Sequence, residues 1–398
     1  MYDSYWQRSV TPNQYQPILD DMDTDVVVVG GGIAGLTTAY LLKQAGLRVI
    51  VLEKNTIGSG TTSKTTGKVT SQHGLVYAGL QKNHGEDTAR IYGEANQEAL
   101  EEIKKLIRQE KIDCGWQVAD NYVYTTDLDR VEELRQEAKI AARLGLPASF
   151  ENFTNLPFET PAAVKFSNQA KFNVQKYVLG LAAAVDGQGS YVFENSKASS
   201  YRDGDLPTVT VEGLSISAKD IVITTKIPAA PLLARGSYAL LERPNTSYIV
   251  AGRYSGPLND MFISPDEENY SILPWRDDTT SLLLIGGESH IPGLGIAEKR
   301  YQILTEYAEK HFGIVIEYRW KGMDYLAYDD IPLVGKLYPW SSHIYTATGF
   351  KKWGLTTSMV SARILHDLIL KQRNPWARVF DSTRKGPIMS IPRYIMRA

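Results

Sequence analysis

The chain has 398 residues, of which 43% are hydrophobic, and a formal net charge of −2 at pH 7. This composition indicates a soluble globular protein of two interleaved domains. The near-neutral charge gives no reason to expect nucleic acid or a polybasic anchor. Cys114 is the only cysteine, which excludes a disulfide framework and a thiolate set for zinc or an iron–sulfur cluster. Small molecules are therefore the expected partners.

Targeting signals are not expected. Residues 1–24 are polar and lack the apolar core of a signal peptide. No stretch approaches the roughly 20 apolar residues of a transmembrane helix. The histidines are scattered, without a ligand pair four residues apart, so we expect no metal site. A cytoplasmic location fits these observations.

The most informative pattern lies in residues 25–54. Four consecutive valines predict a strand buried on both faces, and a G-x-G-x-x-G motif follows at Gly30, Gly32 and Gly35, where a helix begins. A second strand ends at Glu53, about 18 residues past the last glycine. Glycines let the backbone approach a pyrophosphate, and the acid accepts hydrogen bonds from a ribose. A plain βαβ turn explains the glycines but not Glu53, so we predict a dinucleotide site.

Residues 58–68 form a loop rich in threonine, serine and glycine. Such loops offer hydroxyl and backbone donors to a ligand. Because this loop follows the ribose-binding strand directly, we expect it to contact the nucleotide instead of serving as a solvated linker.

The middle of the chain mixes helices and strands. Residues 85–144 are expected to be mainly helical, apart from an aromatic patch near 116–124, and a further helix is expected from about residue 166 to 184. Further strands, which return the chain to the nucleotide domain, are expected at residues 190–194, 208–212 and 219–225.

A second domain is expected from residue 248 onward. Extended segments between 248 and 287, separated by Gly, Pro and Asp clusters, predict an antiparallel sheet. A helix near 297–311 follows. Residues 343–370 then read as strand, glycine turn and helix, which makes a second helix start that faces a ligand. No second G-x-G-x-x-G follows a strand, so one dinucleotide is expected.

These motifs resemble the D-amino-acid-oxidase-like flavoprotein family, which includes glycine oxidase, sarcosine oxidase and gamma-glutamylputrescine oxidoreductase. The resemblance covers roughly Ser4 to Asn374 and rests on the fingerprint, Gly286-Gly287, residues 330–335 and residues 348–354. Residues 65–74 and 347–354 are similar to a bacterial subgroup that often carries a C-terminal Rieske domain. With one cysteine, this chain resembles a stand-alone version.

The resemblance implies an α/β fold. It would have a Rossmann-like FAD-binding domain (discontinuous, residues 1–80, 165–240 and 325–375) and a second α+β substrate domain on a mostly antiparallel sheet (81–164 and 241–324). Residues 376–398 would form a C-terminal tail.

The resemblance also implies non-covalent FAD, because the histidine or cysteine that attaches flavin in some relatives is not present. The pyrophosphate would lie on the glycine turn, the ribose on Glu53, the adenine near Ala198, and the flavin between the hydroxyl-rich loop and the late helix start. The implied cofactor-binding residues are Gly30, Gly32, Ile33, Ala34, Gly35, Glu53, Lys54, Thr61, Thr62, Ser63, Thr65, Thr66, Gly67, Lys68, Ala198, Gly349, Lys352, Trp353, Gly354, Leu355 and Thr356.

In this family a hydride leaves a C–H next to nitrogen for flavin N5, and water hydrolyses the imine. The candidate catalytic residues are Arg276, Lys68, Trp353 and Tyr254. Arg276 resembles a carboxylate clamp, and an exposed salt-bridging arginine is an equal alternative. An aromatic cage for an amine has as its candidates Tyr248, Arg253, Tyr254, Trp275 and Trp353.

Other roles are expected to be structural. His73 and His290 are expected to be hydrogen-bonded structural histidines, and the Ser4–Trp6 arm to be a pinned tail and not a lid. The substrate would be an amine or amino acid, with oxygen or a separate redox protein as electron acceptor. Two alternatives remain: another FAD monooxygenase or reductase, and an electron-transfer or assembly partner without amine turnover.

Overall fold

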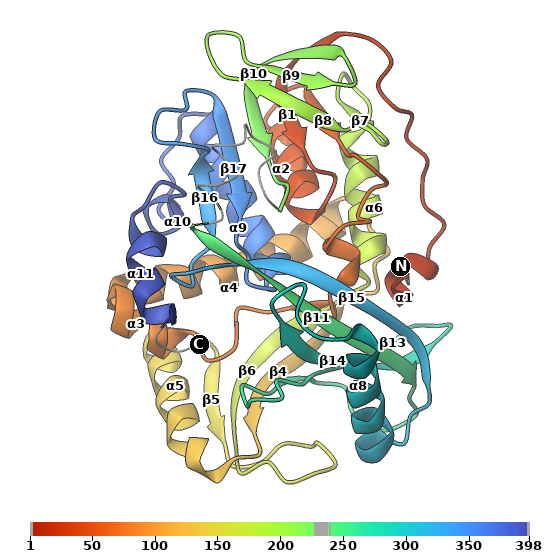
Figure 1. The fold of residues 1–398 in the computed structure, drawn as a ribbon, viewed down its shortest axis with the longest axis vertical. Helices are drawn as coiled ribbons and strands as arrows, with labels where there is room; N and C mark the ends of the chain where they lie inside the picture. Colours follow the sequence, from red (N-terminus) through yellow and green to blue (C-terminus); the bar gives the residue numbers. More distant parts are fainter. Residues whose placement is uncertain (1–2, 227–237, 239, 396–398) are drawn as a thin grey trace.

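The computed structural model describes residues 3–226, 238 and 240–395, and the side chains of 392–395 are not described. Parts of the expected cofactor domain (1–2, 227–237 and 239) and the end of the expected tail (396–398) lie outside the described residues. Two sheets form the body of the molecule (Figure 1).

The first sheet has the order β16-β17-β10-β1-β2-β7, with a β8–β9 hairpin joined to β10. Its central strands pair in parallel, with Val27 between Ile221 and Ile50. The strands are β1 (Met22–Val29), β2 (Val49–Leu52), β7 (Tyr191–Phe193), β8 (Ala198–Arg202), β9 (Thr208–Val211), β10 (Leu214–Ile223), β16 (Leu333–Lys336) and β17 (Ile344–Thr348).

The valine run of β1 is buried on both faces, as its composition predicts. Val26 and Val28 pack in the core that includes α2 (Ile33–Gln44), and Val27 and Val29 pack with residues of the β8–β9 hairpin. Two further helices, α6 (Val174–Val185) and α9 (Gly354–Ile369), lie against α2. The sheet is therefore covered by helices on one face and by a hairpin on the other.

The second sheet has the order β15-β11-β14-β13-β12-β4-β6-β3, with β5 paired to β6. All pairs are antiparallel except β12 with β4. Its strands are β3 (Lys68–Val69), β4 (Gln117–Thr125), β5 (Ala148–Glu151), β6 (Ala162–Lys171), β11 (Glu242–Arg253), β12 (Met261–Ile263), β13 (Ser271–Arg276), β14 (Ser281–His290) and β15 (Ile316–Ala327). The predicted α/β fold with a mostly antiparallel second sheet is confirmed.

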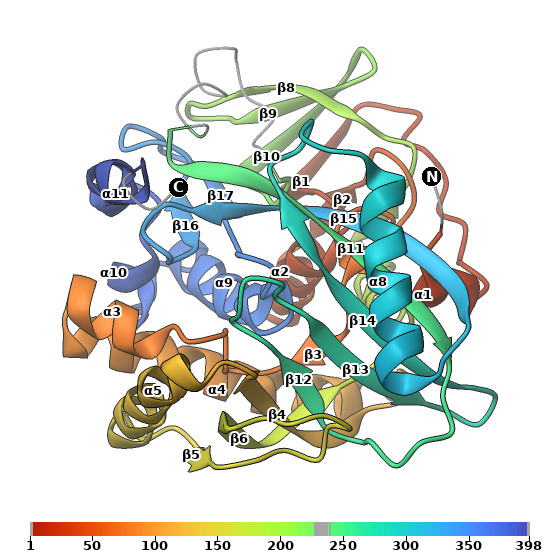
Figure 2. The same ribbon diagram turned by 60° about the horizontal axis from the view of Figure 1, so that its bottom comes forward.

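Helices cover both faces of this second sheet. Figure 2 shows α8 (Ala297–Phe312) lying across β11 and β14. The opposite face, toward the first sheet, meets the helices at the β4–β6 end, namely α3 (Tyr77–His84), α4 (Glu86–Gln109) and α5 (Val131–Arg143). The helix α4 also contacts α9, so it joins the two halves of the molecule.

β3 and all of β6 belong to the second sheet, and residues 68–69 and 165–171 lie within the ranges expected for the cofactor domain. The structure corrects one expectation about this region. The helix expected from residue 166 begins only at Val174, after Asn173 caps it by accepting from the Gln175 and Lys176 N–H groups. Pairing of β6 with β4 on one side, and with β5 and then β3 on the other, overrides the local preference of residues 166–171.

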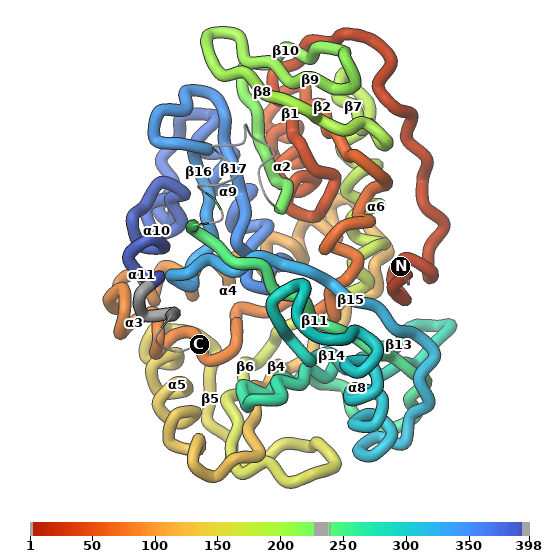
Figure 3. The backbone as a smooth tube through the Cα atoms, in the orientation of Figure 1, coloured from red at the N-terminus to blue at the C-terminus, as the bar shows by residue number. Residues whose placement is uncertain are grey.

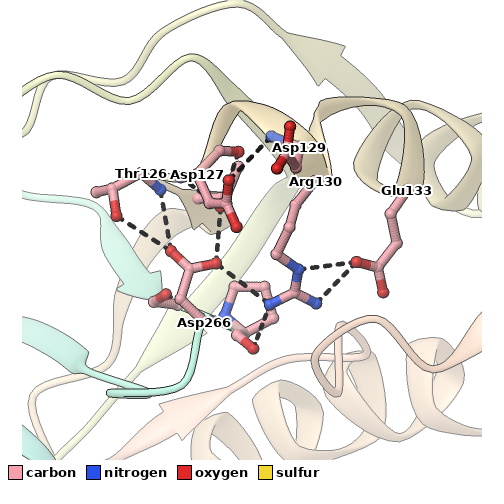
Figure 4. A network of polar contacts seen from close by, with 9 residues as sticks. Thr126, Asp127, Asp129, Arg130, Glu133 and Asp266 are labelled. Carbon is pink, nitrogen blue, oxygen red and sulfur yellow. Dashed lines mark hydrogen bonds and ion pairs between the residues drawn. The ribbon is translucent and has the colours of Figure 1, made fainter.

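A polar network ties the start of α5 to the β12–β13 loop (Figure 4). Asp266 accepts from the Thr126 N–H at 3.0 Å, and its Oδ1 lies 3.2 Å from Arg130, which also pairs with Glu133. Burial opposes the charge on Asp266, but these hydrogen bonds outweigh burial and lower the pKa of the carboxyl. The network fixes the outer end of the second sheet, away from the first.

The two ends of the chain are attached to opposite sides of the molecule. The N-terminal helix α1 (Tyr5–Arg8) lies at the junction of the two sheets, and Figure 3 shows the chain running from it along the outside to β1. At the other end, α10 (Ala377–Phe380) and α11 (Gly386–Ile395) follow β16 and α9. Arg384 anchors this segment through a bidentate pair with the fully buried carboxylate of Asp329, at 2.8 Å for both contacts.

Candidate active site

The glycine turn after β1 is too crowded for side chains. A Cβ at Gly35 would lie 1.9 Å from the Gly30 carbonyl oxygen, and one at Gly31 would lie 2.8 Å from Cβ of Glu53. Gly30 also has a φ of +117°, in the region that favours glycine. The backbone is therefore exposed here to any ligand that approaches the turn.

The helix α2 begins at this turn, and Gly32, the residue before it, has no side chain to cap the helix. The Ile33 N–H donates to Thr62 Oγ1 at 3.1 Å, so the hydroxyl-rich loop touches the helix start. Helix starts with free N–H groups favour anions. The turn thus combines close backbone access with donors for a phosphate.

Glu53 lies directly beside the turn. Its carboxylate accepts from the Gly31 N–H at 2.8 Å and from the Asn55 N–H at 2.9 Å, and it remains partly exposed. The Ser196 N–H donates to the Glu53 carbonyl, which brings Ala198 close to this strand end. The exposed Lys54 follows immediately.

The loop of residues 61–67 runs from the first sheet to the second. Thr61 donates to the Met323 carbonyl of β15 at 3.0 Å, and Ser63 is fully buried. The methyl group of Thr66 lies 3.5 Å from the Cβ position of Gly286 in β14. The structure therefore brings the predicted loop and Gly286 together, far apart though they are in sequence.

The second helix start belongs to α9. Lys351 and Lys352 both have positive φ, and the first residue before the helix, Trp353, provides no side-chain cap. The hydroxyls of Thr357 and Ser358, one turn in, are buried without a partner among the described residues. Gly349, with a φ of +74°, begins the turn that leads here.

His73 packs against this helix start. Its ring stacks on Trp353, and its Nε2 lies 2.9 Å from the Thr70 carbonyl and 3.1 Å from Thr356 Oγ1. A carbonyl only accepts, so Nε2 carries the proton and Nδ1 accepts from the Tyr92 hydroxyl at 2.6 Å. Burial lowers the pKa of His73 to about 3, so the ring is neutral.

Several residues that the sequence did not single out meet at the same place. Asp324 of β15 accepts from the Lys352 N–H at 2.6 Å and lies opposite Asn245 of β11. The Oδ1 of Asn245, a residue only 8% exposed, has no partner in the described chain. Lys226 follows the buried strand β10, and its carbonyl accepts from Thr348 at 2.7 Å. Burial lowers the pKa of Lys226, although the nearby Asp324 offsets part of that effect.

Of these three residues, only Lys226 could have been expected near the site from the sequence. It stands just after a strand parallel to β1, where ligands of such sheets bind. Asn245 and Asp324 lie in long strands, and their position depends on the register of β11 against β15.

Lys68 reaches the same region from the edge of the second sheet. Its ammonium donates to the Phe262 carbonyl and, at 2.7 Å, to Ser271 Oγ. Ser271 pairs with Gly286, so the Lys68 side chain reaches the strand next to β14. Burial lowers the pKa of Lys68 well below its ordinary range.

Arg276 and Tyr254 lie elsewhere. Arg276 is exposed and donates to the Gly256 carbonyl, on the opposite sheet face from its neighbour Trp275. Tyr254 packs against Phe312 of α8. Tyr248 also faces α8, where it contacts Tyr301 and His290, and the exposed Arg253 pairs with Glu317. The candidates for an aromatic cage are thus divided between two faces.

A βαβ turn with an adjacent acid, in an α/β fold with a second, mostly antiparallel sheet, is typical of two-domain dinucleotide-dependent oxidoreductases. The chain matches the family described as FAD dependent oxidoreductase over residues 25–368 and belongs to that family. It is an FAD-dependent enzyme, as the resemblance implied.

Two relatives cover nearly all of the chain. It is 32% identical over 393 residues to the putative Rieske 2Fe-2S iron-sulfur protein YhfW of Bacillus subtilis, covering 96% of this chain and 75% of that one. It is 25% identical to gamma-glutamylputrescine oxidoreductase of Escherichia coli, covering 92% and 88% of the two chains.

Solved structures show the same fold. Glycine oxidase from Geobacillus kaustophilus superposes with a TM-score of 0.77 at 20% identity, covering 91% of this chain and 99% of that one. L-proline dehydrogenase from P. horikoshii gives 0.73 at 18% identity, covering 95% and 99%. Within the described residues, no helix is long and apolar enough to cross a membrane.

Proposed function

We propose that this protein oxidises the carbon–nitrogen bond of an amine or amino acid with a dissociable FAD. Bound FAD would supply the hydride acceptor at N5; the substrate loses a hydride from carbon and a proton from nitrogen, and water hydrolyses the resulting imine. The names of the relatives and neighbours, which include gamma-glutamylputrescine oxidoreductase and glycine oxidase, support this class of substrate.

One observation carries the proposal: the uncapped start of α9 and the loop of residues 61–67 both meet the second sheet. Thr66 lies against Gly286 of β14, and Lys352 Nζ donates to Ser289 of the same strand at 2.6 Å. A flavin held between the loop and the helix start would therefore face this strand. Glycine at position 286 leaves its surface free of a side chain at that point.

The residues present fit FAD. The crowded glycine turn and the free α2 start would hold the pyrophosphate, with Lys226 as a nearby cation, and Glu53 would accept from the ribose. The N–H groups at the α9 start would stabilise negative charge on the reduced ring. The partnerless Asn245 Oδ1 would accept one of the cofactor's hydroxyl or N–H groups.

For the substrate, we propose Trp353, Lys352 and Lys68 as the neighbouring groups. Trp353 is partly exposed, and its indole would pack on an amine. Lys68, held by Phe262 and Ser271, would lie under the reacting atoms as a hydrogen-bonding group whose pKa is lowered by burial. Arg276 and Tyr254 are not proposed for substrate binding, because they lie on the far face of the sheet.

Anaerobic titration tests the proposal. The purified holoenzyme is mixed with a panel of primary amines, secondary amines and amino acids, and the flavin band is followed. We expect at least one amine to bleach the flavin and NADPH to leave it unchanged. Bleaching by NADPH alone would instead favour a reductase or monooxygenase.

A second candidate function is electron transfer to a separate Rieske protein. The relative named as a Rieske protein matches this chain over 75% of its length. A Rieske cluster needs two cysteines and two histidines, whereas Cys114 is the only cysteine here. If no amine bleaches the flavin, but dithionite-reduced enzyme passes electrons to a purified Rieske protein faster than to oxygen, this second function holds.

A further inference from the structure

The N-terminal arm, residues Ser4–Ser9, is ordered by its own hydrogen bonds and by burial of side chains in the core. Ser4 caps α1 in a reciprocal arrangement with Gln7, in which each side chain bonds the backbone of the other residue. Trp6 is completely buried. A four-residue helix is unstable by itself, so its contacts with the rest of the chain must hold it.

The arm contacts the loop of residues 61–67 directly. Trp6 Nε1 donates to the Thr65 carbonyl at 2.7 Å, and a Cβ at Gly67 would lie 3.2 Å from the Trp6 ring. The Lys64 ammonium donates to the Gln7 side chain. Two residues of the arm thus hold two consecutive loop positions, Lys64 and Thr65, by hydrogen bonds and a third, Gly67, by packing.

The arm is held in turn by the second sheet and by α6. Trp6 packs edge-on against Trp275 of β13 with ring centroids 5.3 Å apart, and the Tyr5 hydroxyl donates to Asp277 at 3.2 Å. Asn173, the cap of α6, donates to Ser9 at 2.8 Å. The arm therefore contacts the second sheet and the start of α6, next to the loop that connects the two sheets.

The loop depends on outside partners for its shape. Its internal bonds between backbone groups end with Lys64, whose N–H donates to the Thr61 carbonyl at 2.9 Å, and the Gly67 N–H donates to the Thr65 hydroxyl at 3.3 Å. Beyond that point two indoles hold its carbonyls: Trp320 binds the Lys64 oxygen at 3.2 Å, and Trp6 binds the Thr65 oxygen. Thr66 and Gly67, the residues against Gly286 and β6, follow directly.

We infer that the N-terminal arm is a working part of the cofactor site and that Trp6 is the positioning residue that sets the loop for FAD. This inference rests on the proposed role of the loop in holding the flavin. The arm lies across the loop and holds it in place. The Trp6 indole fixes the Thr65 carbonyl, and thereby the backbone conformation of Thr66 and Gly67.

The test compares Trp6→Phe with Trp340→Phe. Phenylalanine retains most of the buried ring but cannot donate to Thr65, whereas Trp340 is 78% exposed and stacks on Tyr338 in the β16–β17 loop. Apoprotein of each variant is titrated with FAD, and cleavage by trypsin after Lys64 is timed. We expect Trp6→Phe to bind FAD about tenfold more weakly, the effect of losing one hydrogen bond to a partly buried carbonyl.

The same variant is expected to be cut after Lys64 several-fold faster, and Trp340→Phe to behave as the natural protein in both measurements. Added FAD should slow the cleavage less in Trp6→Phe than in the natural protein. An unchanged FAD dissociation constant in Trp6→Phe would overturn the inference, even if the melting temperature of the apoprotein fell.

A second variant, Gln7→Leu, tests the inference even if Trp6→Phe does not fold. Gln7 is partly exposed, and its loss removes the contact with Lys64 and the capping bond to the Ser4 N–H without opening the core. We expect a smaller loss of FAD affinity, two- to fivefold, in the same direction. No step uses an amine, so failure of the arm proposal and failure of amine oxidation are separate results.

Discussion

The imidazole of His73 stacks on the indole of Trp353 with ring centroids 5.0 Å apart and planes 14° from parallel. Residue 73 follows the hydroxyl-rich loop, and residue 353 immediately precedes α9, so this pair joins the two segments that the sequence predicted on either side of a flavin. Because the His73 ring is neutral, it does not attract an anion. The free N–H groups at the start of α9 are then the donors that would bind negative charge on a ligand.

Removing the Tyr92 hydroxyl should weaken this arrangement. In Tyr92→Phe, Nδ1 of His73 loses its donor while remaining buried, and an unsatisfied buried acceptor costs about 1–3 kcal/mol. We expect the free energy of unfolding, measured with urea, to fall by that amount. Tyr15→Phe, at a partly buried tyrosine of the N-terminal segment, provides a comparison that should change little. Equal stability of Tyr92→Phe and the natural protein would argue against the assigned tautomer.

Gly35→Ala should abolish cofactor binding. The new methyl group would lie 1.9 Å from the Gly30 carbonyl, so the turn or the start of α2 must move. We expect apoprotein that remains colourless after dialysis against FAD. The matched change is Gly79→Ala in the exposed part of α3, where nothing lies within 4 Å of the new Cβ. That variant should bind FAD normally and gain about 0.5–1 kcal/mol of stability from better helix propensity. A yellow Gly35→Ala protein would disprove the role of the turn.

Lys171 should make stability depend on pH. Burial lowers the pKa of this lysine to about 8 from 10.5, so between these values the unfolded chain binds the proton that the folded chain has lost. Stability contributed by this group therefore rises as pH increases from 8 to 10.5, and a penalty of up to about 3 kcal/mol remains below pH 8.

The Lys171→Met variant isolates this effect. Its unfolding free energy relative to the natural protein should be most favourable below pH 8 and decline toward pH 10.5, as urea titrations at several pH values would reveal. Lys165→Met on the same strand is the control, because its partner Asp120 raises the pKa of Lys165. A difference between Lys171→Met and the natural protein that stays constant across this range would refute the prediction.

Asn245→Ala should separate apoprotein stability from cofactor affinity. The Oδ1 atom of Asn245 is buried without a described partner, so its removal relieves an energetic cost in the apoprotein. When FAD is bound and supplies a donor to this atom, the same substitution removes a hydrogen bond to the cofactor. We expect the melting temperature of the apoprotein to stay the same or rise, and the increase on adding FAD to shrink. An increase as large as in the natural protein would remove Asn245 from the site.

Part of this site could be predicted because its geometry is local. The turn from β1 into α2, the acid at the end of β2 and the helix start after residue 353 each depend on a few consecutive residues, and all appear at the expected positions. The prediction for residues 166–171 was wrong because a strand partner, and not local preference, decides their conformation. The face on which Arg276 lies likewise depends on the register of β13, because one residue along a strand moves a side chain to the other face of the sheet.

The sequence by itself therefore determined the cofactor-binding half, since valines, glycines and Glu53 in this order leave the backbone few alternatives. Only the tertiary structure decided which distant residues complete it: Trp6 on Thr65, His73 on Trp353, and Asn245 opposite Asp324. These contacts depend on strand register and on the curl of the second sheet, and both arise from packing summed over the whole core instead of from any short stretch of residues.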